Sequence, residues 1–151
     1  MRFVLLVLVL ALIAHARPAT AQISVIPIRD LAFGPVIVGL PSNVPPSHPT
    51  RSGQFQFTAP TGSRVRLRFT LPDQLDGPAG AAMPISFRNG DAIAIGTAPN
   101  SVPQSLNPRA ASVFTIPSPT MNVFIGGTVT PAGNQAHGSY AGTITFTVTV
   151  F

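Results

Sequence analysis

The stretch GSYAGTITFTVTVF, residues 138–151, alternates threonine with an apolar residue from Thr143 to Val150 without a break. Alternation with a period of two is typical of a β-strand that has one buried and one solvent-facing side. The threonine side is therefore expected to meet solvent. The opposite, apolar side is expected to pack on a core and consists of Ile144, Phe146, Val148 and Val150.

Other segments alternate in the same way and predict further strands. Residues 53–60 place two phenylalanines on one face and two glutamines on the other, and residues 63–71 alternate three arginines with apolar residues. The Thr61-Gly62 turn between these segments predicts a β-hairpin. An Asn-Gly-Asp turn likewise predicts a hairpin between residues 83–88 and 92–96.

The composition also favours an all-β protein. The chain contains 17 prolines and 13 glycines and no lysine or glutamate, which are both good helix formers. We expect a single Ig-like antiparallel β-sandwich of about eight or nine strands. Residues 23–28 and 31–38 are expected to be extended, with Pro27 marking an edge strand or a bend. The proline-rich and polar loops are predicted at residues 40–53, 72–82 and 97–110.

The predicted core follows from the apolar faces of these strands. It consists of Phe33, Phe55, Phe57, Val65, Leu67, Phe69, Ile85, Phe87, Phe114, Phe124, Tyr140, Ile144, Phe146 and Val148. The glycine pair Gly126-Gly127 follows an apolar run, but it lacks the lysine and the following helix that a phosphate-binding loop needs. We therefore expect a β-bulge there.

Residues 1–21 have the build of a secretory signal peptide. Arg2 precedes an apolar run, and Ala19-Thr20-Ala21 provides the small residues expected before a cleavage site. The apolar run of about a dozen residues is shorter than the roughly twenty that a membrane-spanning helix requires. We predict cleavage after Ala21, a β-sandwich domain over residues 22–151 without a membrane span, and secretion to the periplasm or the cell surface.

Charge and cysteine content narrow the possible functions. Removal of residues 1–21 leaves seven arginines against four aspartates, a net charge of +3, which is not typical of a nucleic-acid-binding protein. The chain has no cysteine, so disulfides, zinc–thiolate sites and iron–sulfur clusters are excluded. The fold must then be stabilised by burial and strand pairing.

Several motifs, in this order, resemble a known family. They are DLAFGPVIVG (30–39), GQFQFTAPTGSRVRLRFTL (53–71) and MNVFIGGTVTPAGNQAHGSYAGTITFTVTV (121–150). Together they are similar to the bacterial secreted domain-of-unknown-function family DUF4402, over residues 23–151. The resemblance implies a pilin-like sandwich, related in appearance to spore-coat-U-like subunits, at the bacterial cell surface. It implies no catalytic residues.

The C-terminal segment also resembles the chaperone-binding end of chaperone–usher pilins. Gly138 stands fourteen residues from the end, and alternating apolar positions follow it, with Phe151 as the last aromatic residue. The resemblance implies strand exchange or chaperone docking through Gly138, Tyr140, Ile144, Phe146, Val148 and Val150. The implied partners are further copies or related subunits, joined by strand addition, and a periplasmic chaperone or usher.

Titratable residues suggest no catalytic, metal or cofactor site. His48 and His137 lie in predicted loops, and metal sites need three or four ligands at suitable spacing. Asp73 and Asp76 share a loop and could form a carboxylate pair, while Asp30 and Asp91 occupy positions typical of turns and caps. We predict that the protein is not an enzyme.

Arg64, Arg66 and Arg68 form a stripe on one strand face. Such a stripe can bind a polyanion, or it can be a solvated face with cross-strand partners such as Gln54 and Gln56. The favoured function is that of an exported structural subunit, for example of fimbriae, with a role in cell adhesion. The alternative is a stand-alone secreted module that binds anionic surface glycan or lipopolysaccharide.

Overall fold

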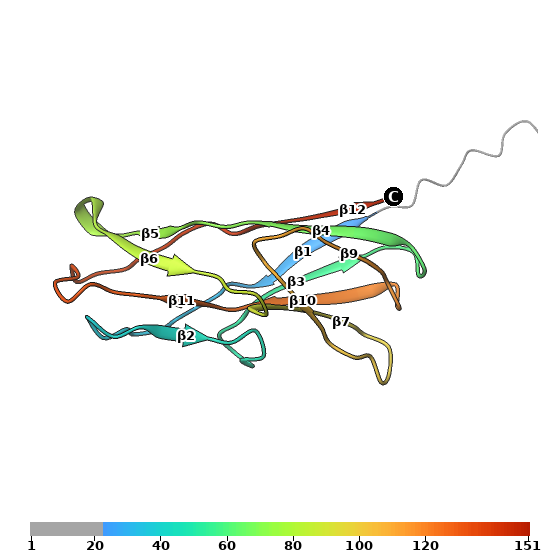
Figure 1. Ribbon diagram of the computed structural model, residues 1–151, viewed down its shortest axis with the longest axis horizontal. Coiled ribbons are helices and arrows are strands. Elements are labelled where there is room, and N and C mark those ends of the chain that lie inside the picture. Colours follow the sequence, from blue (N-terminus) through green and yellow to red (C-terminus); the bar gives the residue numbers. More distant parts are fainter. Residues whose placement is uncertain (1–22) are drawn as a thin grey trace, which may run out of the picture.

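The computed structural model describes residues 23–151, which form an antiparallel all-β protein with one short 3-10 turn at Pro78–Gly80 (Figure 1). The predicted signal peptide, residues 1–21, lies outside the described residues. The strands form three sheets. The predicted all-β sandwich class is confirmed, and the Ig-like topology stays a prediction.

Two of the sheets face each other across a common core. The five-stranded sheet has the order β1-β3-β10-β7-β8 and contains β1 (Ser24–Arg29), β3 (Gly53–Thr58), β10 (Thr120–Ile125), β7 (Ala92–Gly96) and β8 (Gln104–Leu106). The three-stranded sheet has the order β12-β4-β9 and contains β12 (Thr145–Val150), β4 (Arg64–Thr70) and β9 (Ser112–Thr115).

The third sheet extends the molecule along its long axis, at the left of Figure 1. It has the order β2-β11-β6-β5 and contains β2 (Ser42–Val44), β11 (Gly127–Val129), β6 (Ala82–Ser86) and β5 (Gln74–Asp76).

The alternating segments form the strands that the sequence predicts. β4 exposes its arginines and buries Val65, Leu67 and Phe69, in agreement with its period of two. β12 pairs with β4, so that Phe146 lies opposite Phe69 and Val148 opposite Leu67. The apolar side of the C-terminal stretch therefore packs on the protein's own core.

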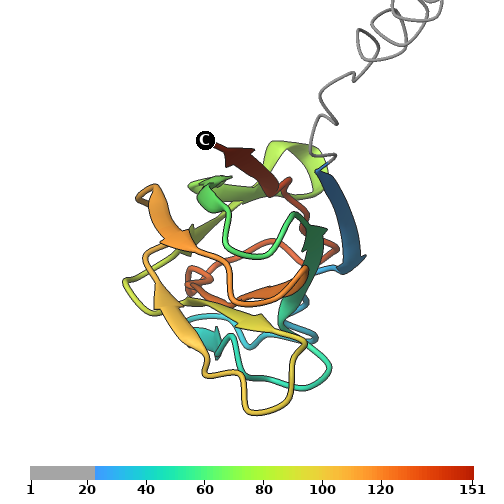
Figure 2. The same cartoon turned by 90° about the vertical axis from the view of Figure 1, so that its right-hand side faces the viewer.

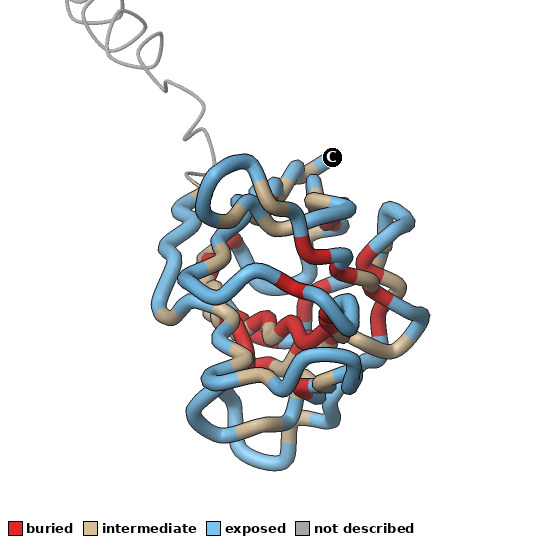
Figure 3. The backbone as a smooth tube through the Cα atoms, turned by 90° about the vertical axis from the view of Figure 1, so that its left-hand side faces the viewer, coloured by how far each residue is buried: buried red, intermediate tan, exposed pale blue. Residues whose placement is uncertain are grey.

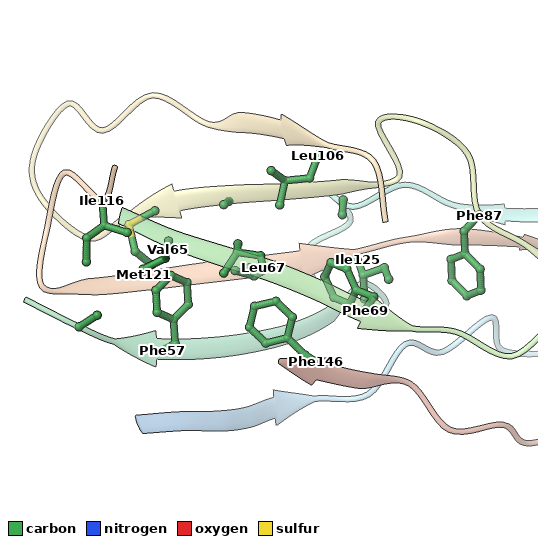
Figure 4. Packing of buried hydrophobic residues seen from close by; sticks show 14 of the residues in the cluster. Phe57, Val65, Leu67, Phe69, Phe87, Leu106, Ile116, Met121, Ile125 and Phe146 are labelled. Carbon is green, nitrogen blue, oxygen red and sulfur yellow. The ribbon is translucent and has the colours of Figure 1, made fainter. Parts of the chain in front are cut away.

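Most of the predicted core is correct. Figure 4 shows how side chains from β3, β4, β10 and β12 meet between the sheets, and Figure 3 shows buried segments surrounded by exposed loops. The predicted residues that are buried are Phe57, Val65, Leu67, Phe69, Ile85, Phe87 and Phe146. Those that are partly buried against this cluster are Phe33, Phe55, Phe114, Tyr140, Ile144 and Val148.

Phe124 was predicted in the core, and that prediction is wrong. In β10 the side chains of Met121, Val123 and Ile125 point inward, so Phe124, at the intervening position, points to the outer face. Alternation places methionine, valine and isoleucine on the buried side of β10. The period of two therefore predicts which side chains are buried better than the size of the aromatic ring does.

Both predicted hairpins are wrong. β3 pairs with β1 and β10, whereas β4 pairs with β12 and β9, so the Thr61-Gly62 turn carries the chain from one sheet to the other. The N–H of Gly62 donates to the carbonyl of Ile116 at 3.1 Å, which anchors this crossing. β6 and β7 also belong to different sheets. Turn residues and alternation look alike in a hairpin and in a crossing between sheets.

The predicted loops and one predicted strand also need correction. Residues 40–53, 72–82 and 97–110 contain the three-residue strands β2, β5 and β8, which are too short to show a clear period. In contrast, residues 31–38 form no strand. Some of their apolar side chains pack against the core, and others are exposed to solvent.

Gly126 marks a change of sheet, where a bulge was predicted. It lies between β10, in the five-stranded sheet, and β11, in the four-stranded sheet. A Cβ atom at this position would lie 2.1 Å from the carbonyl oxygen of Val44. Only glycine allows the backbone to approach β2 so closely at this crossing.

We expect Phe146→Ala to lower the free energy of unfolding by about 3–5 kcal/mol, because it empties a buried aromatic site. The Phe146 ring lies 4.9 Å from that of Phe69 and 5.2 Å from that of Phe55, between centroids. Urea unfolding measures the effect. The control Phe151→Ala removes an exposed ring and should cost no more than about 1 kcal/mol. Equal losses in the two variants would contradict this core assignment.

Candidate functional site

β12 is an edge strand with one free side. It pairs with β4 along its whole length, from Thr145 opposite Thr70 to Val150 opposite Val65. No other strand among residues 23–151 pairs with it. Its other row of backbone N–H and C=O groups is therefore available to an added strand.

β1 is the corresponding edge of the opposite sheet. It pairs with β3 alone, and its register shifts between Pro27 and Arg29, in agreement with the predicted edge or bend. Five of its six residues are exposed, including Val25, Ile26 and Ile28. The N-terminal segment is thus the first strand of its own sheet, but most of its apolar surface is uncovered.

A groove opens on the side of the molecule where β1 ends, and Ile144, which directly precedes β12, lines it. Figure 2 shows β1 and β12 on this side, and no ladder joins them within the described residues. The groove has a volume of about 750 Å³. Its floor includes the core side chains Phe55, Ile85 and Ile125. One wall is formed by residues 30–36 and the other by residues 135–144.

The two walls are not bonded to each other. In the first wall the N–H of Ala32 donates to the carbonyl of Arg51 at 2.9 Å. In the second, Ala141 exchanges backbone hydrogen bonds with Asp76 at 2.8 and 2.9 Å. No backbone hydrogen bond connects the walls in residues 23–151. Each wall is therefore fixed to its own neighbours, and the space between them stays open.

Tyr140 shapes the second wall. Its hydroxyl donates to the carbonyl of Ala136 at 2.8 Å and accepts from the Nε2 of Gln135 at 2.6 Å. The buried Gln135 also donates to the carbonyl of Ala82 at 3.1 Å. A Cβ atom on Gly77 would lie 2.2 Å from the Tyr140 ring, so the ring packs directly on this backbone. These contacts connect the wall to β6.

The residues predicted for strand exchange or docking have different positions. Gly138, Tyr140 and Ile144 line the groove. Phe146 is buried in the core, and Val148 and Val150 are partly buried against it. Sequence reasoning missed the first wall. Its only signal was an apolar run, residues 31–38, which was taken for a strand.

The three arginines of the predicted stripe project from the outer face of β4, and all are exposed. The predicted cross-strand partners are wrong, because Gln54 and Gln56 lie in the other sheet. The Nε2 atoms of both glutamines donate to the Oδ1 of Asn122 at 3.3 Å. Stripe residues instead lie opposite β12 and β9, and Phe151 stacks against two of them.

Asp30 and His137 line the groove, whereas His48, Asp73 and Asp91 make local contacts. The Nδ1 of His48 accepts from the backbone N–H groups of two following residues. Asp73 forms an exposed ion pair with Arg109 at 3.1 Å, and Asp91 accepts from the N–H of Arg88 at 2.7 Å, as expected of a turn residue. No group of three or more potential metal ligands occurs among residues 23–151.

Comparisons of the chain with protein-family models, with curated proteins and with solved structures find no match. The part of the chain that the structure describes contains no helix with the length and hydropathy of a membrane span. Two surfaces of the molecule have the properties of a binding site, the groove and the outer face of β4.

We expect Tyr140→Phe to lower the free energy of unfolding by about 1 kcal/mol, because the buried amide of Gln135 loses a hydrogen-bond partner. Thermal unfolding measures the change. The control Ser139→Ala, at an exposed neighbouring position, should leave the melting temperature unchanged. A Tyr140→Phe variant as stable as the parent would show that the hydroxyl does not hold this wall.

Proposed function

We propose that the protein is an exported, non-catalytic assembly subunit of the bacterial cell surface. Its groove binds an extended segment of a neighbouring subunit between residues 30–36 and residues 135–144. The observation that carries this proposal is the open groove, which is lined by side chains of the hydrophobic core and by Ile144, directly before the edge strand β12.

Strand addition would use both properties of the groove. An added strand gains backbone hydrogen bonds from a free edge, and its alternate side chains enter the space between the sheets. Full burial of one aliphatic or aromatic side chain contributes about 1.5–3 kcal/mol. Two or three alternating apolar residues of an occupant therefore contribute about 3–9 kcal/mol, in addition to the backbone hydrogen bonds.

The proposed occupant is the N-terminal strand of a second copy or a related subunit. β1 is held by a single ladder, with β3, so its release breaks one set of strand hydrogen bonds. It carries apolar residues on both faces, including Val25 on one and Ile26 on the other. Before assembly, a periplasmic chaperone would cover the same groove, in line with the resemblance of residues 138–151 to chaperone–usher pilins.

The test compares two identical substitutions. Val38 lines the groove and is 44% exposed, whereas Val102 lies outside the groove and is 78% exposed. The full chain is exported from a bacterial host, and the mass of the purified protein is measured by light scattering. We expect multimers or SDS-resistant ladders for the parent and for Val102→Glu, and mainly monomer for Val38→Glu, because a carboxylate in the groove opposes apolar insertion.

A stable monomeric parent, with or without a co-expressed periplasmic chaperone, would contradict the proposal. So would equal multimer formation by the two glutamate variants. Both variants should keep the parent melting temperature within the error of calorimetry, because neither residue belongs to the buried core.

A further inference from the structure

The outer face of the three-stranded sheet carries a row of three positive charges. Arg64, Arg66 and Arg68 project from the same side of β4, and all are exposed. Successive same-face residues of a strand are about 7 Å apart. The backbone positions of the three arginines therefore extend over about 14 Å along the strand.

No aspartate among residues 23–151 forms an ion pair with this row. The ion pair between Arg109 and Asp73 is the only one among residues 23–151. On the neighbouring strands, the residues directly opposite Arg66 and Arg68 are Thr149, Val113 and Thr147. The strand positions directly beside these two arginines therefore carry no acidic side chain.

Phe151 orders two of the guanidinium groups. The Cζ atoms of Arg64 and Arg66 each lie 5.3 Å from the centroid of its ring. The N–H of Phe151 donates to the carbonyl of Arg64 at 3.1 Å, which fixes the backbone beneath the ring. Contact with an aromatic ring restricts the arginine rotamers and leaves N–H groups free to bind an anion.

Threonine hydroxyls border the arginine row. Thr149 lies opposite Arg66, and Thr147 lies opposite Arg68. Both threonines are exposed, on the side of β12 that faces away from the core. The face therefore combines hydroxyl groups, which donate and accept, with guanidinium groups, which only donate.

We propose that this face binds a linear acidic polysaccharide. The arginines bind carboxylate or sulfate groups, the threonines bind sugar hydroxyls, and the Phe151 ring packs against a sugar face. Charge-assisted hydrogen bonds from guanidinium to carboxylate can be bidentate, which fixes the direction of the anion.

The surface fits a polysaccharide better than other polyanions. Single-stranded nucleic acids are typically bound by several aromatic platforms in a basic groove, whereas this face has one ring. A lipid surface requires several apolar residues that insert into it. Within residues 23–151 this face exposes only two large apolar residues, Val113 and Phe151. The proposal is independent of the groove, because it uses the outer side of β12 and not its free edge.

The test uses the full chain exported from a bacterial host and biolayer interferometry with immobilised polysaccharides. The probes are polygalacturonate, dextran sulfate and, as the neutral probe, dextran. We expect binding to the two acidic polymers and not to dextran, with affinity that decreases as salt is added. The triple change R64Q/R66Q/R68Q should weaken binding about tenfold or more.

Single changes provide a matched control. Arg66→Gln and Arg88→Gln each remove one exposed positive charge, but Arg88 lies outside the stripe. Only Arg66→Gln should weaken binding, and Thr149→Val should weaken it as well, because a sugar hydroxyl loses its partner. Melting temperatures of all variants should match that of the parent.

Several results would overturn the proposal. They are an absence of binding to both acidic polymers, binding that the triple change leaves intact, and equal losses for Arg66→Gln and Arg88→Gln. Tighter binding to a single-stranded DNA oligonucleotide or to vesicles of anionic lipid than to either acidic polymer would assign the face to another ligand class. Failure of the groove variant Val38→Glu to assemble would not affect any of these binding measurements.

Discussion

The contact among four phenylalanine rings joins the two facing sheets. Phe55 and Phe57 come from the five-stranded sheet, and Phe69 and Phe146 come from the three-stranded sheet, with centroid separations of 4.9 to 6.3 Å. No ladder connects β1 to β12 in the described part of the chain. On this side of the sandwich the two sheets are therefore held together by side-chain packing and not by strand pairing. The position of β12, the free edge and the groove all depend on it.

Much of the fold could be predicted because alternation reveals which side of a strand is buried. It placed Val65, Leu67 and Phe146 correctly, since each lies in a strand long enough to show its period. Alternation does not reveal which strand pairs with which. The sheet crossing at Gly62 has the same local features as a hairpin, and so does the turn between β6 and β7. Both hairpins were therefore predicted wrongly. The three-residue strands β2, β5 and β8 were missed for lack of a period.

The candidate sites could be predicted only in part. The alternation of residues 64–68 revealed the arginine stripe, because all three arginines lie in a single strand. Its neighbours depend on strand pairing, and the structure replaces the predicted Gln54 and Gln56 by Thr147 and Thr149. The groove needs two walls that are distant in sequence. Residues 138–144, in the second wall, carried a recognisable pattern. Residues 30–36, in the first wall, have no ladder and no period, so an apolar run was their only local signal and was taken for a strand.

β12 presents three separate surfaces. Its inner side packs on the core, its outer side carries threonines beside the arginine row, and its free edge begins directly after Ile144, which lines the groove. Occupation of the edge by a neighbouring subunit leaves the outer side uncovered. A polymer joined through the groove would then repeat the same basic face once per subunit along its length. Weak individual contacts would add up through multivalency, with avidity set by the number of joined copies and not by the affinity of one.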